Sequence, residues 1–102
     1  MKIEFSFNQS ALEKQGYTLD DVYSTIKKHF AGKGLPCIAD GEVLAFGDNG
    51  QENDYAYMWN IILRLLKSEW FVAFASSCTF FDDDDIEEDV LSQAWKVQKR
   101  MA

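Results

Sequence analysis

The chain has few of the residues that build a metal or redox centre. Its 102 residues include one histidine, His29, and two cysteines, Cys37 and Cys78. The cysteines are far apart and form no Cys-x-x-Cys pair, so four soft zinc ligands cannot be assembled. Two cysteines also make no disulfide framework. We therefore expect no metal, no cofactor and reduced thiols.

Signals for export or membrane insertion are lacking as well. The first residues show no charged segment followed by an apolar one, which is the pattern of a signal peptide. The longest apolar stretch, residues 61–81, is interrupted by Arg64, Lys67 and Glu69. A membrane span takes about 20 apolar residues, so this stretch is too polar. We expect a cytoplasmic protein that does not contact a membrane.

Apolar residues are plentiful, at 47% of the chain, and aromatic residues make up 15%. That is enough to bury one core in a chain of this length, so residues 1–102 are interpreted as a single domain. Apolar and polar residues alternate over residues 2–8, which predicts a strand. Apolar stripes at helical spacing predict helices over 18–31, with Thr18 as N-cap, and over 55–68.

The remaining elements follow from turn signals and apolar runs. Asp40-Gly41 lies between two apolar runs in residues 35–47 and predicts a hairpin turn with positive φ at both positions. Residues 70–81 predict a last strand, which is so long that either Trp70 and Phe71 belong to the preceding turn or a bulge lies near Ser76-Ser77. Residues 82–101 predict a third helix with Ile86, Val90 and Leu91 on its inner face. The order is that of an α+β, ferredoxin-like βαββαβ sandwich. It would have a four-stranded antiparallel sheet, two helices on one face and an added C-terminal helix.

The net charge of the chain comes from one segment. The chain has 17 acidic and 10 basic residues, and seven of the acids lie in residues 82–89. Subtracting these seven leaves ten of each sign, so the net charge of −7 is local. The seven are Asp82, Asp83, Asp84, Asp85, Glu87, Glu88 and Asp89.

Three interpretations of this acidic segment compete. Acids favour a helix start, but each is worth only about 0.3–1 kcal/mol there and neighbouring acids repel one another. A docking surface for a basic protein partner would explain the excess. A calcium site would need six to eight oxygens on a folded loop with a glycine at a fixed position, and neither this segment nor residues 48–54 fit that spacing.

The candidate partner-binding residues are therefore the exposed acids and one aromatic side chain on the predicted third helix. They are Asp83, Asp84, Glu87, Glu88 and Trp95. The apolar second helix and Trp95 leave a homodimer as an open alternative. Conventional nucleic-acid binding is disfavoured, because Phe5 and Phe7 share the core face with Ile3 and no basic patch surrounds the opposite face.

Segments of the chain resemble small uncharacterised proteins of mobile elements in Gram-positive bacteria. The resemblance lies in Gly16-Tyr17-Thr18-Leu19-Asp20-Asp21-Val22-Tyr23, in Gly34-Leu35-Pro36-Cys37 and in Asp89-Val90-Leu91. It implies no activity and no site residues.

We predict a non-enzymatic protein-interaction module that uses the acidic segment. One alternative is an acidic nucleic-acid mimic that inhibits a DNA-binding enzyme. Another is an enzyme with a cryptic site near Cys37 and His29, but a catalytic cysteine needs a histidine within hydrogen-bond reach and a third orienting group.

Overall fold

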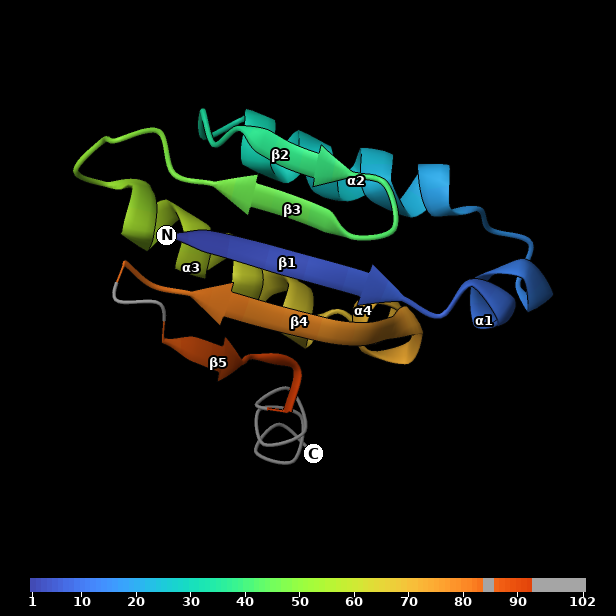
Figure 1. The fold of residues 1–102 in the computed structure, drawn as a ribbon. Coiled ribbons are helices and arrows are strands. Elements are labelled where there is room, and N and C mark those ends of the chain that lie inside the picture. The colour runs from blue at the N-terminus through green and yellow to red at the C-terminus, as the bar shows by residue number, and fades with distance from the viewer. Residues whose placement is uncertain (84–85, 93–102) are drawn as a thin grey trace.

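The computed structural model describes residues 1–83 and 86–92, which form one antiparallel sheet with helices packed behind it (Figure 1). The sheet order is β2-β3-β1-β4-β5, and β1 lies at its centre. In chain order the elements are β1 (Lys2–Phe7), α1 (Gln9–Lys14), α2 (Leu19–Ala31), β2 (Cys37–Asp40), β3 (Leu44–Gly47), α3 (Asp54–Lys67), α4 (Glu69–Phe74), β4 (Ala75–Phe81) and β5 (Glu87–Asp89).

The α+β class predicted from the sequence is confirmed, but the strand count is not. The described residues form a sheet of five strands, where four were predicted. They also form four helices, including the short α1 and α4. The alternation in β1 is confirmed at its first positions, because Ile3 and Phe5 are fully buried while Lys2 and Glu4 are partly exposed.

Aromatic side chains from four elements meet at Phe5 in the core. The ring of Phe30 on α2 stacks on Phe46 of β3, with centroids 3.9 Å apart. Phe5 makes edge-to-face contacts with Phe30, Phe46 and Phe71, with centroid distances of 6.0, 6.3 and 5.8 Å. Edge-to-face and offset pairs of this kind add to the free energy gained from burial alone.

The predicted start of α2 is confirmed in detail. The Thr18 hydroxyl accepts a hydrogen bond from Asp21 N at 3.2 Å, and the Asp21 carboxylate accepts one from Thr18 N at 3.0 Å. This reciprocal capping box gives hydrogen-bond acceptors to two backbone N–H groups, those of Thr18 and Asp21, that have no acceptor within the helix. After the helix, Gly34 takes a positive φ of 72°, which turns the chain toward β2.

The predicted hairpin forms, but with a different turn. β2 and β3 pair antiparallel and are joined by residues 41–43, three residues rather than two. The φ of Gly41 is not positive, so the predicted tight turn is wrong. The register also shifts between Cys37 and Ala39. A tight turn with positive φ would match the right-handed twist of the two strands. Here the three-residue connection and the bulge in β2 allow the strands to twist instead.

The predicted strand over residues 70–81 is too long, but the bulge predicted near Ser76-Ser77 is confirmed, because the pairing with β1 passes from Ser77 to Ala75. Residues Glu69–Phe74 form the short helix α4, and β4 begins only at Ala75. The reason is the burial of Phe71, which contacts both Phe5 and Phe7. Residues 70–74 are all apolar, and Ala73 is the only small residue among them. They lack the alternation of apolar and polar residues that marks a half-buried strand. One helical turn can therefore form here and place Phe71 beneath β1.

The acidic segment does not begin a helix at Asp82, so the predicted position of the helix start is wrong. Residues 87–89 form a strand, and helical conformation is described only from residue 91, where the Asp89 carboxylate accepts a hydrogen bond from Ser92 N at 3.3 Å. Asp82 and Ile86 close a turn, in which Asp82 N donates to Ile86 O at 3.2 Å and Ile86 N donates to the Asp82 carboxylate at 3.1 Å. The chain then returns as β5 and pairs with β4. Val90 is fully buried and its N–H bonds to Cys78 O at 2.9 Å. Residues 93–102, where most of the predicted third helix falls, lie outside the described residues.

Val90 and Ile86 give a matched test of this arrangement, because Val90 is buried while Ile86 is 60% exposed. We expect Val90→Ala to lower the free energy of unfolding by roughly 2 kcal/mol, from two buried methyl groups and the cavity they leave. Ile86→Ala should change it by less than about 0.5 kcal/mol. Urea denaturation measures both. Equal losses would contradict the strand and favour a helix with both side chains inside.

Candidate functional site

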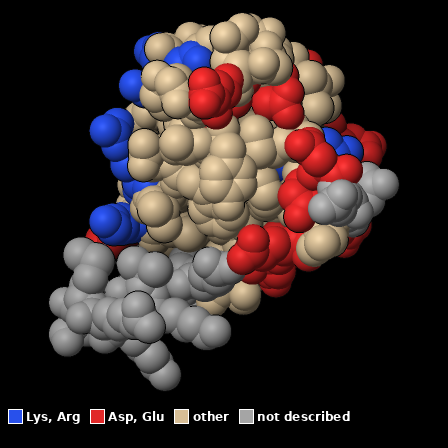
Figure 2. Space-filling model, turned by 90° about the vertical axis from the view of Figure 1, so that its left-hand side faces the viewer, with Lys and Arg blue, Asp and Glu red and all other residues tan. Residues whose placement is uncertain are grey.

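The described acids of residues 82–89 form one edge of the molecule, which we call the acidic edge: Asp82, Asp83, Glu87, Glu88 and Asp89. The three residues of β5 are all exposed, and the Asp83 side chain is 85% exposed. Figure 2 shows acidic residues gathered on one side of the molecule and a column of Lys and Arg residues on the opposite side. The charges of the two signs are thus largely separated.

The strand conformation of β5 distributes its carboxylates over two faces. Glu87 and Asp89 pair with Phe81 and Thr79, so they point to the face away from the helices. Two residues along a strand span about 7 Å, which sets the spacing of these two carboxylates. Glu88 pairs with the buried Phe80 and points the other way.

A shallow depression of about 520 Å³ adjoins the acidic edge on the open face of the sheet. Six of its seven lining residues carry a hydroxyl or carboxylate group. The lining residues are Ser76, Ser77, Thr79, Glu87, Asp89, Leu91 and Ser92. Such oxygens accept hydrogen bonds from cationic donors, so this surface suits ammonium or guanidinium groups better than anions.

An edge strand made only of acids also has a structural effect. In the described part of the chain β5 is the last strand of the sheet, so its outer N–H and C=O groups face away from β4. Charged side chains on an edge strand discourage further strands from adding. The sequence suggested a helix start as the reason for all of the acids, but in β5 only Asp89 is seen to bond to a backbone N–H of the helical residues that follow, Ser92 N at 3.3 Å.

The structure brings together three of the five residues predicted as the partner-binding site. Asp83 lies in the turn, and Glu87 and Glu88 follow in β5. Asp84 and Trp95 lie outside the described residues. The composition of the segment was sufficient to single out these acids, but not to place them on a sheet edge.

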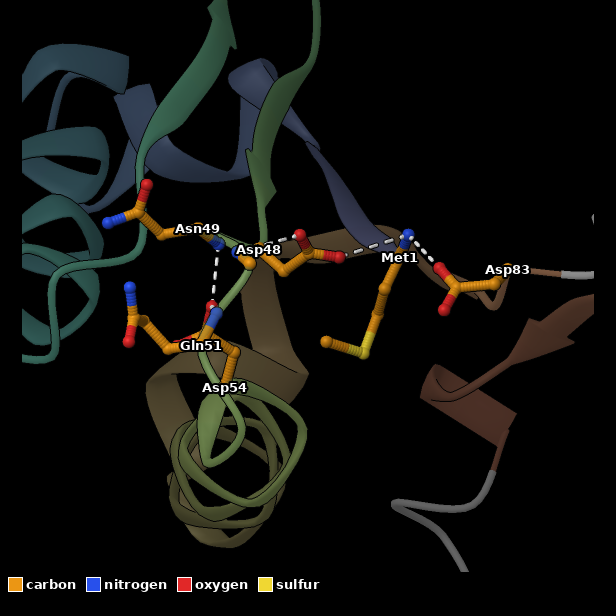
Figure 3. Close-up of polar contacts among 7 residues, drawn as sticks. Met1, Asp48, Asn49, Gln51, Asp54 and Asp83 are labelled. Atoms are coloured by element: carbon orange, nitrogen blue, oxygen red, sulfur yellow. Dashed lines mark hydrogen bonds and ion pairs between the residues drawn. The ribbon is translucent and has the colours of Figure 1, made fainter.

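A polar cluster that the sequence did not predict joins the acidic edge to the loop after β3. Figure 3 shows Met1 between two carboxylates. Its amino group lies 2.7 Å from an Asp83 oxygen and 3.3 Å from an Asp48 oxygen. The hydrogen bond to Asp83 is the largest cause that raises the pKa of this amino group, and burial partly opposes it. Because Asp83 is so exposed, solvent weakens this ion pair.

The loop before α3 is organised by a buried carboxylate, Asp54, whose residue is only 2% exposed. One oxygen of Asp54 accepts hydrogen bonds from Asn49 N at 2.6 Å and from Gln51 N at 3.1 Å (Figure 3). Asn53 or Asp54 was predicted as the helix cap. The structure puts Asn53 at the N-cap without a side-chain bond and turns Asp54 back to the loop.

This loop has carboxylates, yet its geometry is not that of a metal site. Asp48 accepts a hydrogen bond from Gly50 N at 3.3 Å, and Gly50 has a φ of 72°. One oxygen of Asp48 and one of Asp54 thus accept from backbone N–H groups, and the second Asp48 oxygen faces the Met1 amino group. Within residues 1–83 and 86–92, no group of three or more His, Cys, Asp or Glu side chains could hold a metal ion.

The two cysteines differ in environment, and neither forms a catalytic pair with His29. Cys37 is exposed in the edge strand β2, and its thiol donates to Ala39 O at 3.5 Å. His29 is exposed near the end of α2. Cys78 is buried in β4, and burial raises the pKa of its thiol far above the ordinary value. A thiol held protonated in this way is a poor nucleophile.

No protein-family model matches the chain, and no curated protein or solved structure matches it. The resemblance to proteins of mobile elements therefore stays a prediction. None of the helices in the described ranges has the length and apolarity that crossing a membrane takes.

Asp54→Ala should lower the free energy of unfolding by about 2 kcal/mol, because two backbone N–H groups lose a charged acceptor. Hydrogen exchange of the Asn49 and Gln51 amides should become faster, which links the loss to the loop. The control is Glu52→Ala, an exposed acid in the same loop, with an expected change below about 0.5 kcal/mol. Similar effects of both variants would contradict the role assigned to Asp54.

The thiols should react with an aromatic disulfide reagent in two separate phases. In the native protein Cys37 is expected to react rapidly, while Cys78 is protected until the sheet opens. Absorbance should show one fast thiol in buffer and two in denaturant. The Cys37→Ser variant should lose the fast phase alone. Two fast thiols in the native protein would show that β4 is not buried as described.

Proposed function

We propose that this protein is a non-catalytic binding module whose acidic edge contacts a basic protein. The observation that carries the proposal is the placement of the exposed Asp83, Glu87, Glu88 and Asp89 on a turn and an edge strand. Asp83, Glu87 and Glu88 do not lie at a helix start, although the Asp89 carboxylate accepts a hydrogen bond from Ser92 N of the helical residues 91–92. The number of these acids also exceeds what protection of a three-residue edge needs, since a single charged residue can block an edge.

The chemistry of the surface supports a partner rich in lysine or arginine. Glu87 and Asp89 face the depression beside β4 together with the Ser77 and Thr79 hydroxyls. An arginine or lysine placed there would form charge-assisted hydrogen bonds. Each exposed ion pair contributes only about 0.2–1 kcal/mol, so stable binding requires several at once. Such binding weakens with salt, because the Debye length falls to about 3 Å at 1 M.

The proposal extends to the fold and the compartment. The antiparallel order β2-β3-β1-β4, with α2 and α3 between strands in the βαββαβ sequence, supports a ferredoxin-like core to which β5 is added. In such a core β5 carries the acids at the outer end of the sheet. Both cysteines are free, which supports the reducing cytoplasm as the location.

A nucleic-acid mimic is the second candidate, and the extended shape of β5 favours it. Carboxylates crowded into one helical turn could not follow a phosphate backbone. In β5, Glu87 and Asp89 instead point to one face about 7 Å apart. A DNA-binding enzyme would then be the basic partner, and the acidic edge would occupy its DNA site.

The experiment compares two sets of neutralised acids. One variant carries Asp83→Asn, Glu87→Gln and Glu88→Gln. The control carries Glu13→Gln, Asp20→Asn and Glu69→Gln, which are exposed acids of α1, α2 and α4. Both lose three charges, so the net charge is matched. Partners are captured from lysate at about 50 mM salt and identified by mass spectrometry, and their affinities are then measured with purified protein.

We expect the edge variant to bind the captured basic partner at least about tenfold more weakly, the loss of some three ion pairs. The control should bind within about twofold of the unmodified protein. A salt concentration of about 0.5 M should release the partner. Equal binding by both variants would overturn the proposal. Release by duplex DNA, with a DNA-binding partner, would favour the mimic.

A further inference from the structure

A second hollow differs in chemistry from the depression beside the acidic edge and shares no lining residue with it. It is formed by α1, α2 and α4 and has a volume of about 750 Å³. Small-molecule sites commonly measure about 300–1,000 Å³ and are mostly apolar with a few polar groups. Its lining combines the apolar or aromatic Leu12, Tyr17 and Phe74 with the polar Asp21, Ser24 and Lys28.

The walls of this hollow are held in place by backbone hydrogen bonds. After α1, Gly16 takes a φ of 81°, and Tyr17 N donates to Leu12 O at 3.0 Å. This closing turn fixes Tyr17 at the rim. The opposite wall is tied to the start of α1, because Asn8 N donates to Phe74 O at 2.8 Å. The hollow is therefore formed without a ligand, which reduces the ordering cost of binding.

An aromatic surface is left uncovered at the rim. Tyr17 is 52% exposed, and its ring meets the edge of Phe74 with centroids 6.0 Å apart. Trp70 lines the same hollow and is itself only partly buried. Partly exposed aromatic rings in a concave site can stack against a flat apolar molecule.

Of the two charged groups in the lining, Lys28 favours an anionic head group and Asp21 opposes it. Lys28 forms no ion pair with any residue of the described ranges, so its ammonium can pair with a ligand. Asp21 also lines the hollow, but its carboxylate is already bonded to Thr18 N in the capping box. Asp21 and Lys28 are seven residues apart, about 10 Å along the helix. The Ser24 hydroxyl lies between them on α2 and can donate to an anion.

We propose that this hollow binds a small anion with a flat apolar body, such as an aromatic carboxylate or sulfonate. The body packs against Tyr17 and Phe74, and the head group pairs with Lys28. The net charge of −7 does not prevent this, because its source is residues 82–89 rather than the helices that line the hollow. Charges more than about 10 Å apart are largely screened at 0.1 M salt.

The test uses the fluorescent probe 1-anilinonaphthalene-8-sulfonate, an aromatic sulfonate, and its uncharged relative N-phenyl-1-naphthylamine. Each is titrated against the full chain at 0.1 M salt. Lys28→Gln removes the proposed head-group partner, and Lys67→Gln is the control on α3. Tyr17→Ala removes the aromatic wall, and Tyr55→Ala is its control, since Tyr55 is 58% exposed and does not line the hollow. Near-UV circular dichroism checks that every variant is folded.

We expect one sulfonate site per chain. Lys28→Gln should weaken the sulfonate about fivefold to tenfold, the loss of one charge-assisted hydrogen bond, and leave the uncharged probe unchanged. Tyr17→Ala should weaken both probes. Both control variants should bind the probes within about twofold of the unmodified protein. The variant with a neutralised acidic edge should do the same, so the result of this test does not depend on the test of the partner surface. Equal effects of Lys28→Gln and Lys67→Gln, or several equivalent weak sites, would overturn the proposal.

Discussion

The packing of aromatic rings around Phe5 is the constraint on which the rest of the structure depends. Phe5 lies on the central strand and receives Phe30 from α2, Phe46 from β3 and Phe71 from α4. These elements are distant in sequence, so the cluster holds both halves of the chain to one sheet. Because Phe71 must reach Phe5, residues 69–74 form a helical turn and β4 starts only afterwards. That same turn closes the hollow beside α1 and α2.

The central position of β1 also determines which strands are left at the edges. β1 is paired on both sides, with β3 and β4, so β2 and β5 end the sheet. Each edge is poorly suited to growth. β2 follows Pro36 and contains a bulge, while β5 consists of three acids. If β5 of a second copy of the chain paired with β5 of the first, the acids of the two strands would lie opposite one another and repel. Charge repulsion therefore disfavours a second copy at this edge, and the same charges are the basis of the proposal that the edge contacts a basic partner.

The end of the sheet near Met1 is organised by a different interaction, the hydrogen bonds of carboxylates to nitrogen. Asp54 holds the loop before α3, and Asp48 and Asp83 lie on either side of the Met1 amino group (Figure 3). The partly buried bonds of Asp54 are expected to contribute more to stability than the exposed pair, because solvent competes less with them. The exposed pair at Asp83 contributes less and connects the acidic edge to this loop.

The sequence by itself determined the elements whose signals are local. The alternation of β1, the capping box of Thr18 and Asp21, and the helix of α3 rest on neighbours within a few residues. It also identified Asp83, Glu87 and Glu88 as unusual, because their charge is visible in composition. Only the tertiary structure decided that Asp83 lies in a turn and that Glu87 and Glu88 lie on a strand. Asp and Glu disfavour strands by propensity, and β5 forms because β4 offers hydrogen bonds and Val90 enters the core. The turn made by Asp54 and the hollow beneath Tyr17 likewise depend on contacts between separate elements, which no local pattern encodes.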